Sequence, residues 1–127
     1  MDILDFLSAA NGIAQLCAAD GQFLGLLTSN QYDRKSIINP NTYGSSYSYH
    51  SIQNPVSPYG GDCGVYSPYN LTCTNPPIIL YKEQPVLVVT KKAYVLGSSL
   101  PIVDPDLMLG VYARHSYLIP HPAMASF

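Results

Sequence analysis

The stretch IAQLCAADGQFLGLLTSN, residues 13–30, places the turn pair Asp20-Gly21 between two apolar segments. A two-residue turn of this composition accepts the positive φ angles that a tight hairpin needs at both central positions. The pattern therefore predicts a β-hairpin with one strand at 13–19 and the other at 22–28.

In this register, Cys17 would lie beside Leu24 and Ala18 beside Phe23. Side chains alternate between the two faces of a strand, and both faces of the predicted hairpin come out largely apolar. An antiparallel pair that faces water on one side normally carries polar residues there. We therefore expect other parts of the chain to cover this hairpin on both faces.

The stretch IILYKEQPVLVVT, residues 78–90, repeats this design around a polar turn at 83–84. It predicts a second hairpin that is again apolar on both faces. An offset of 62 residues aligns Leu26 with Val88, together with their neighbours. This alignment indicates that the chain contains two related hairpins.

Short helices are predicted near both ends of the chain. Apolar residues in DILDFLSAA, residues 2–10, have helical spacing, and Gly12 is a suitable residue at the end of that helix. In DPDLMLGVYA, residues 104–113, Asp104 is a favoured N-cap and Pro105 is favoured at the first helical position. We expect about two turns of helix there.

Residues 31–77, between the two hairpins, contain an internal repeat. The phrase Y-x-x-x-S-I-x-N-P occupies residues 32–40 and returns fifteen residues later at 47–55, and a decayed copy, YSPYN, lies at 66–70. Asn before Pro is held in an extended backbone, and its side chain can bond the main chain two residues on. Each Asn-Pro pair therefore predicts a turn with a built-in hydrogen bond.

Seven of the eleven tyrosines lie within residues 32–69. A tyrosine ring can pack on an apolar surface while its hydroxyl stays in water or finds a partner. We predict that 31–77 is an ordered, extended Tyr/Asn-Pro-rich ribbon that wraps the hairpins and covers their unpaired edges. The alternative is a disordered linker, because Gly, Ser and Pro are frequent, but Tyr and Ile are too frequent for disorder.

The run GQFLGLLTSNQYDRKSIINPNTYGSSYSYHSIQNPVSPYG, followed by YSPYN and NPPIILY, resembles a family of small bacterial proteins, cyanobacterial ones among them. Its members share a G-x-[FL]-L-G-x-L-[ST]-[ST]-N-x-Y-D opening and Y-G-S-x-Y-S-x-x-S-I-x-N-P phrases. The resemblance spans about residues 20–110 and implies a shared fold unit without a particular activity. This chain departs from the phrasing around residue 41 and at 61–65, where we expect the repeat to lose its regularity.

The composition limits the classes of partner. The 127 residues fit one domain, only 11% of them are charged, and the net charge is −2. The six basic residues are scattered, so we expect no nucleic-acid partner. No apolar run reaches the length of a membrane span. Asp2 and Asp5 stand where a secretion signal needs positive charge, which favours a cytoplasmic location.

Candidate chemistry is sparse. Cys63 and Cys73 are close enough in a Gly/Pro/Asn-rich region to form a disulfide, with two free thiols as the alternative, and the three cysteines show no metal-binding spacing. His50 lies in the predicted ribbon without a nucleophile motif nearby. Asp104 and Asp106 could act as an acid–base pair, but helix capping explains them. We expect no enzyme activity, no cofactor and no metal site.

The sequence therefore predicts one mainly β domain: two β-hairpins packed together, wrapped by the ribbon, with short N- and C-terminal helices. Its parts are the first helix and hairpin at 1–30, the ribbon at 31–77, the second hairpin at 78–96, the short helix at 104–113 and an apolar C-terminal arm at 114–127.

We expect a non-catalytic structural or interaction protein, either an accessory subunit or a self-assembling component. A small-ligand or carbohydrate-binding module is the alternative, because exposed tyrosines with Asn and Ser donors also suit adaptable ligand sites. The residues predicted to contact a protein partner, or another copy of the chain, are those of the Tyr-rich surface and the arm: Tyr43, Tyr47, Tyr49, Tyr59, Tyr66, Tyr69, Tyr117, Leu118, Ile119 and Phe127.

Overall fold

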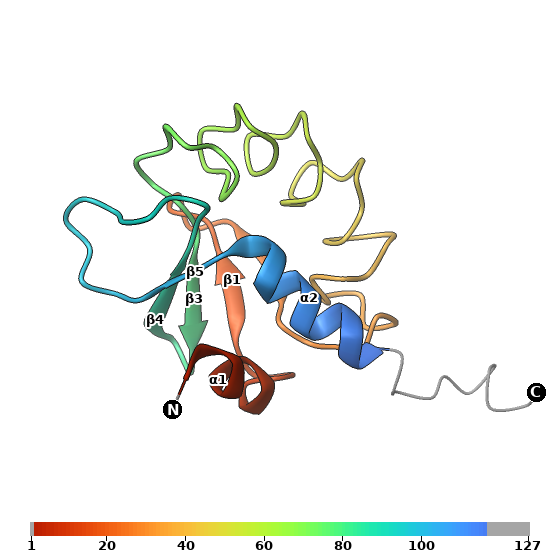
Figure 1. The fold of residues 1–127 in the computed structure, drawn as a ribbon. Helices are drawn as coiled ribbons and strands as arrows, with labels where there is room; N and C mark the ends of the chain where they lie inside the picture. The colour runs from red at the N-terminus through yellow and green to blue at the C-terminus, as the bar shows by residue number, and fades with distance from the viewer. Residues whose placement is uncertain (1, 117–127) are drawn as a thin grey trace, which may run out of the picture.

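A computed structural model describes residues 2–116 of the chain. It is mainly β, as predicted, and consists of one five-stranded sheet and two helices (Figure 1). The strands are β1 (Gln15–Cys17), β2 (Phe23–Leu26), β3 (Ile78–Tyr81), β4 (Gln84–Val89) and β5 (Ile102–Val103), and the helices are α1 (Ile3–Ala9) and α2 (Pro105–Ser116).

The strand order in the sheet is β2-β1-β3-β4-β5. The β1–β2 and β3–β4 pairs are antiparallel hairpins, and β1 pairs with β3 in antiparallel fashion to join them. Strand β5, which the sequence did not indicate, pairs with β4 in parallel. The two hairpins are therefore neighbours in a single sheet.

The predicted register of the first hairpin is confirmed for Gln15 with Leu26 and for Leu16 with Gly25, and it is wrong from Cys17 on. Cys17 faces Phe23 rather than Leu24, because the pairing shifts between Leu16 and Cys17. The strands are also shorter than predicted, since the turn occupies 18–22, closed by a 2.8 Å hydrogen bond from the backbone N–H of residue 18 to the carbonyl of residue 22.

The turn of the second hairpin lies one residue before its predicted position. Lys82 and Glu83 occupy it, with φ of 51° and 68°. Positive φ at both central positions is the geometry that a two-residue hairpin turn requires. Strand β4 therefore begins at Gln84, and Pro85 lies within it, opposite Leu80 at a shift in the pairing.

Both helices form, with different bounds from those predicted. Asp2 caps α1 by accepting a hydrogen bond from the N–H of Asp5 at 2.8 Å. Asp104 caps α2 in the same way, accepting from the N–H of Asp106 at 2.7 Å. Helix α2 continues to Ser116, beyond the predicted end at residue 113, because no helix-breaking proline occurs before residue 120.

One core joins the sheet, the helices and the long connection between β2 and β3. In α2, Tyr112 is fully buried and donates a hydrogen bond to the Leu7 carbonyl of α1 at 2.8 Å. From the connection, Ile37, Ile52 and Tyr59 reach the same core. Fully buried residues of the strands and helices complete it: Leu7, Leu16, Leu24, Ile79, Val89 and Met108.

Residues 30–73 contain none of these strands or helices. We call this part of the chain the turn segment. It leaves the sheet after β2, passes α2 and arches as a row of loops over to the start of β3 (Figure 1). At its start it touches the sheet, because the backbone of Leu26 exchanges hydrogen bonds with Lys35 and Ile37 at 2.6 and 3.0 Å.

Candidate interaction surface

The turn segment is built from turns that repeat every three residues. In each turn, a backbone N–H donates to the carbonyl three residues earlier, as in a β-turn. The donors are Asp33, Ser36, Asn39, Thr42 and Ser45, then Ser51, Asn54, Ser57 and Gly60, and then Ser67, Asn70 and Cys73. Most of these residues are small and polar, and most are buried.

Asparagine side chains fix the turns at the Asn-Pro positions. Asn39 accepts a hydrogen bond from the N–H of Asn41 at 2.8 Å, and Asn54 accepts one from the N–H of Val56 at 3.0 Å. These are the bonds to the main chain two residues on that the sequence predicted. Each amide also donates to a carbonyl six residues earlier, to Asp33 at 3.0 Å and to Ser48 at 3.1 Å.

Three serine hydroxyls link their turns to the chain eight residues earlier. Ser36 donates to the carbonyl of residue 28 at 3.0 Å, Ser51 donates to that of residue 43 at 2.8 Å, and Ser57 donates to that of residue 49. Cys73 takes the same role, because its thiol donates to the carbonyl of residue 65 at 3.0 Å. Throughout the described residues, every buried side-chain nitrogen and oxygen has a hydrogen-bond partner.

The spacing of the turns changes once, between Gly60 and Gly64, where four residues instead of three separate successive turns. A β-carbon on Gly60 would lie 2.3 Å from the carbonyl oxygen of Asn54, and one on Gly64 would lie 2.5 Å from that of Gly60. The break coincides with residues 61–65, one of the two places where the repeat was expected to lose its regularity. Around residue 41, where a second lapse was expected, the turns remain regular.

The tyrosines predicted as partner contacts divide into two groups. Tyr47 and Tyr49 are 91% and 62% exposed. Tyr59 is buried, and Tyr66 stacks on its ring with centroids 5.8 Å apart. Tyr43 is half-buried, with its ring at 5.1 Å from that of Phe23 in an edge-to-face contact.

Tyr59 attaches the turn segment to the β1–β2 turn. Its hydroxyl donates to the Asp20 carboxylate at 2.7 Å. This hydrogen bond raises the pKa of Tyr59 to about 12 and lowers the pKa of Asp20. Both shifts follow because the bond favours the neutral phenol and the ionised carboxylate.

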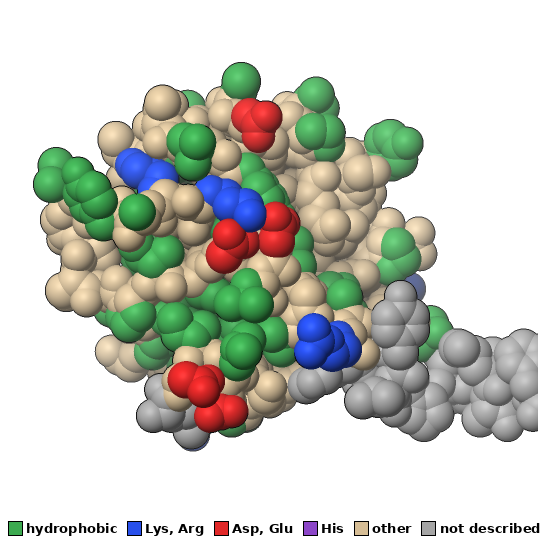
Figure 2. Space-filling model, viewed as in Figure 1, with side chains coloured by type: hydrophobic (Ala, Val, Ile, Leu, Met, Phe, Trp, Pro, Cys, Tyr) green, Lys and Arg blue, Asp and Glu red, His purple; other side chains and the backbone are tan. Residues whose placement is uncertain are grey.

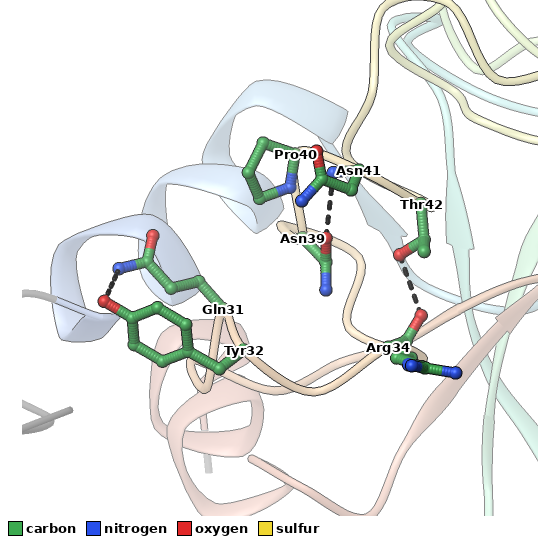
Figure 3. Close-up of a pocket in the computed structure, with 7 residues that line it drawn as sticks. All are labelled: Gln31, Tyr32, Arg34, Asn39, Pro40, Asn41 and Thr42. Carbon is green, nitrogen blue, oxygen red and sulfur yellow. Dashed lines mark hydrogen bonds between the residues drawn. The ribbon is translucent and has the colours of Figure 1, made fainter. Parts of the chain in front are cut away.

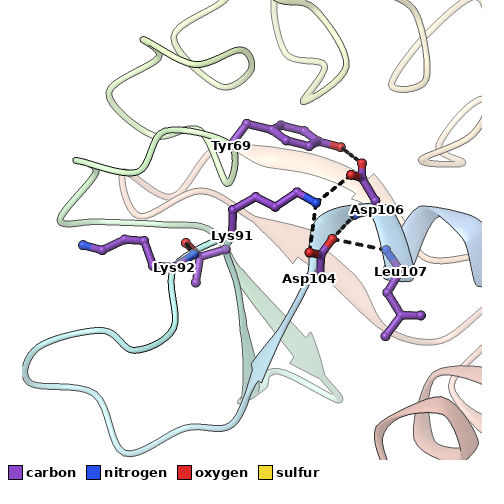
Figure 4. A network of polar contacts seen from close by, with 7 residues as sticks. Tyr69, Lys91, Lys92, Asp104, Asp106 and Leu107 are labelled. Carbon is purple, nitrogen blue, oxygen red and sulfur yellow. Dashed lines mark hydrogen bonds and ion pairs between the residues drawn. The ribbon is translucent and has the colours of Figure 1, made fainter.

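Tyr69 attaches the other end of the turn segment to α2 (Figure 4). Its hydroxyl donates to Asp106 at 2.9 Å, and Lys91 forms ion pairs with Asp106 at 2.7 Å and Asp104 at 2.9 Å. Lys91 lowers the pKa of Asp106, with a smaller contribution from Tyr69. Asp104 and Asp106 therefore serve helix capping and cross-linking in this arrangement.

The turn segment exposes six large aromatic or aliphatic side chains. Tyr32 and Tyr49 line the grooves at its start, and we call the other four the outer rim. They are Tyr47, Val56, Val65 and Leu71, with exposed fractions of 91%, 89%, 63% and 65%. Sequence reasoning missed the three aliphatic members. The signal was present, because small polar residues at every third position from Asn30 on mark the inward positions and leave the others outside.

The surface around the rim carries little charge. Between residues 36 and 77, Asp62 is the only Asp, Glu, Lys or Arg. Figure 2 shows separate hydrophobic groups protruding along the upper edge of the molecule, where the turn segment lies, with few charged side chains among them. Depletion of charge together with exposed aromatic and aliphatic groups is typical of the core of a protein interface.

The remaining predicted residues are those of the C-terminal arm and the two cysteines of the possible disulfide. Tyr117, Leu118, Ile119 and Phe127 of the arm lie outside the described residues. Cys63 and Cys73 are both free thiols in the structure, the alternative to the disulfide. Cys63 is exposed and Cys73 is buried.

The described residues hold no group of three or more His, Cys, Asp or Glu side chains that could bind a metal ion. Neither helix in this part of the chain is long and apolar enough to cross a bilayer.

Two open grooves lie side by side at the start of the turn segment. One, of about 750 Å³, lies between Tyr32, Arg34 and Pro40 (Figure 3). The other, of about 540 Å³, reaches Tyr49 and His50. Arg34, Asn41 and Thr42 line both.

Comparison with known proteins adds no relative to this picture. No family model matches the chain, and neither the curated proteins nor the solved structures contain a significant match to it.

Proposed function

We propose that this protein is a non-catalytic interaction protein, an accessory subunit or a self-assembling component, that binds its partner through the outer rim of the turn segment. The observation that supports this most is the exposure of four large apolar side chains in a region with almost no charge. Single exposed apolar residues are ordinary on protein surfaces. These four lie within 25 residues of nearly uncharged chain that also exposes Tyr49.

A fixed backbone beneath the rim favours binding. Side-chain hydrogen bonds from Asn39, Ser51, Asn54 and Ser57 hold successive turns to earlier parts of the chain. A surface that is ordered before binding loses less conformational entropy when a partner arrives. The turn segment would thus carry the varied side chains of a loop. Its loss of conformational entropy on binding would be as small as that of a helix or strand.

We interpret the turn segment, with the few residues that join it to the strands, as the wrapping ribbon of two packed hairpins. Three contacts support this: Ile37 beside β2, Tyr59 on Asp20 of the β1–β2 turn, and Tyr69 on Asp106 of α2. We also propose that the chain shares its fold unit with the bacterial family that its Y-G-S-x-Y-S phrases resemble.

The rim is tested by changing its two most exposed members together, Tyr47→Ser with Val56→Ser. We expect this double variant to lose the self-association that light scattering detects with the unchanged protein, or the partner that the unchanged protein captures from its native source. The matched control is Tyr94→Ser with Leu96→Ser, because these side chains are 70% and 88% exposed but lie in the loop before β5.

Equal mass and equal capture for the rim variant and the unchanged protein would refute the proposal. Loss of binding in the control as well would show that general surface hydrophobicity, rather than the rim, is responsible. Circular dichroism of each variant confirms that the fold is intact, as expected for side chains that make few contacts.

The C-terminal arm is tested separately by ending the chain after Ser116, because α2 runs to that residue. We propose that Tyr117, Leu118, Ile119 and Phe127 add apolar contact with the partner. Shortening should then weaken association without abolishing it. A shortened protein with unchanged association would remove the arm from the proposal and leave the rim.

A further inference from the structure

The two grooves at the start of the turn segment bring together groups that recognise anions and sugars. Arg34, Asn41 and Thr42 line both of them, so the two grooves are adjacent. Figure 3 shows Arg34 and Thr42 at one end of the first groove, with Tyr32 and Pro40 farther along it. None of the lining residues belongs to the outer rim.

The cations of this site are available to a ligand. Arg34 and Lys35 are exposed, and the ion pairs found among residues 2–116 involve neither of them. The carboxylate of Asp33, next to Arg34 in the chain, accepts the N–H of Lys35 at 2.8 Å. The Asp20 carboxylate on the side of His50 accepts the Tyr59 hydroxyl. Two exposed basic residues thus line the grooves, and neither forms an ion pair with a neighbouring carboxylate.

The aromatic rings of the site are held in place while remaining accessible. The ring of Tyr49 is 62% exposed, yet it makes edge-to-face contacts with His50 at 5.1 Å and with Tyr59 at 6.0 Å. Tyr43 is held in the same way by Phe23. Rings fixed by such contacts present large amphipathic surfaces at a low entropy cost.

We propose that the paired grooves bind an acidic saccharide, a chain of sugars that carries carboxylates such as uronic acids. Tyr49 and Tyr43 would lie against sugar faces, and Asn41, Thr42 and Ser48 would bond hydroxyl groups. Arg34 would receive a carboxylate in the two-pronged geometry that suits a guanidinium. This site is distinct from the rim, so the two proposals stand or fall separately.

An acidic peptide is the less suitable ligand. Peptides are usually recognised through apolar pockets for their side chains or by pairing with a free strand edge. No Leu, Ile, Val, Met or Phe lines either groove. In this part of the turn segment the backbone N–H groups of Ser36, Asn39 and Thr42 already donate within the turns. The hydroxyl, amide and ring groups that remain match a sugar chain better.

The test uses isothermal titration of the full chain with a hexamer of galacturonic acid, and with the same hexamer methylated at its carboxyls. We expect the acidic hexamer to bind at low ionic strength and the ester at least tenfold more weakly, which corresponds to about 1.4 kcal/mol. Arg34→Ala should weaken binding of the acidic hexamer by the same factor, because it removes the charged partner. Tyr49→Ala should weaken both ligands, because stacking does not need the carboxylate.

The control for charge is Lys82→Asn, which removes a cation from the β3–β4 turn and keeps a residue type that tolerates the positive φ there. It should leave the affinity within twofold of that of the unchanged protein. No detectable binding of the acidic hexamer, equal affinity for the ester, or an equal effect of Lys82→Asn and Arg34→Ala would each overturn the proposal. Tighter binding of a poly-glutamate peptide than of the hexamer would overturn the assignment to a saccharide.

Discussion

Leu16 and Ile79 lie opposite each other at the middle of the β1–β3 pairing, and both are fully buried. They occupy equivalent positions in the two hairpins, and the residues on either side pair crosswise, Gln15 with Leu80 and Cys17 with Ile78. The two hairpins are thus related by an approximate two-fold axis through this pair.

Residues related by this axis should contribute similarly to the free energy of unfolding. We expect Leu16→Ala and Ile79→Ala each to lower the free energy of unfolding by about 2–5 kcal/mol, since each leaves a cavity in a close-packed interior. Urea unfolding measures both. In the double variant the two losses should not add, because the residues share a contact. A large loss at one position with almost none at the other would contradict the equivalence.

The thiol of Cys73 stands where the other turns have a serine hydroxyl. We expect Cys73→Ser to keep the hydrogen bond to the Val65 carbonyl, and to leave the free energy of unfolding unchanged or higher. Cys73→Val fills similar space without a donor and should cost about 1–3 kcal/mol, because the carbonyl loses its partner. Cys63→Ser, at an exposed thiol, is the control. A serine variant as unstable as the valine variant would refute the equivalence of thiol and hydroxyl.

The glycines of the break in the turn segment should be the least replaceable. Gly60→Ala places a β-carbon against backbone oxygens at 2.3 and 2.6 Å, so we expect a loss of about 2 kcal/mol or more. Gly110→Ala is the matched case, because nothing lies within 4 Å of its added carbon and it is an exposed position inside α2. There alanine should stabilise by about 0.5–1 kcal/mol. Chemical unfolding of both variants checks the contrast.

The Tyr59–Asp20 hydrogen bond predicts a dependence of stability on pH. Since folding raises the pKa of Tyr59 from 10.0 to about 12, its contribution is complete below pH 10 and is lost as the pH rises toward about 12. Since folding lowers the pKa of Asp20, its contribution is present above the ordinary pKa of 3.8 and is lost as the pH falls through the lowered value.

Tyr59→Phe should therefore show a shallower loss of unfolding free energy between about pH 10 and pH 12 than the unchanged protein. Part of the loss should remain, because burial also raises the pKa of Tyr69 and of Tyr112. Tyr47→Phe, at a ring 91% exposed, is the control. Parallel curves for Tyr59→Phe and the unchanged protein would show that this bond does not contribute.

Features fixed by local chemistry could be predicted from the sequence. Asp104 before Pro105 identified the start of α2, and the Asn side chains bond the main chain two residues on as expected. The paired hairpins followed from apolar strands around polar turns. The register of the first hairpin followed as far as Leu16. The shift at Cys17 did not, because it depends on how β1 is held between two neighbouring strands.

Features that depend on distant contacts could not be predicted in this way. Strand β5 has only two residues and exists because β4 offers it a parallel edge. Whether a tyrosine faces inward depends on partners far along the chain, such as Asp20 for Tyr59 and Asp106 for Tyr69. The groove at Arg34 also forms only when the turns on either side of it fold together.

The three-residue step of the turn segment has a consequence for how such chains can diverge. Inserting or deleting residues in multiples of three would keep the small polar residues at the step positions on their inward side, whereas any other number would turn those side chains outward. Gly60–Gly64 shows that one extra residue is tolerated where glycine removes the steric obstacle. Evolution could thus vary the length of this arch, and with it the reach of the molecule, while the sheet beneath it stays the same.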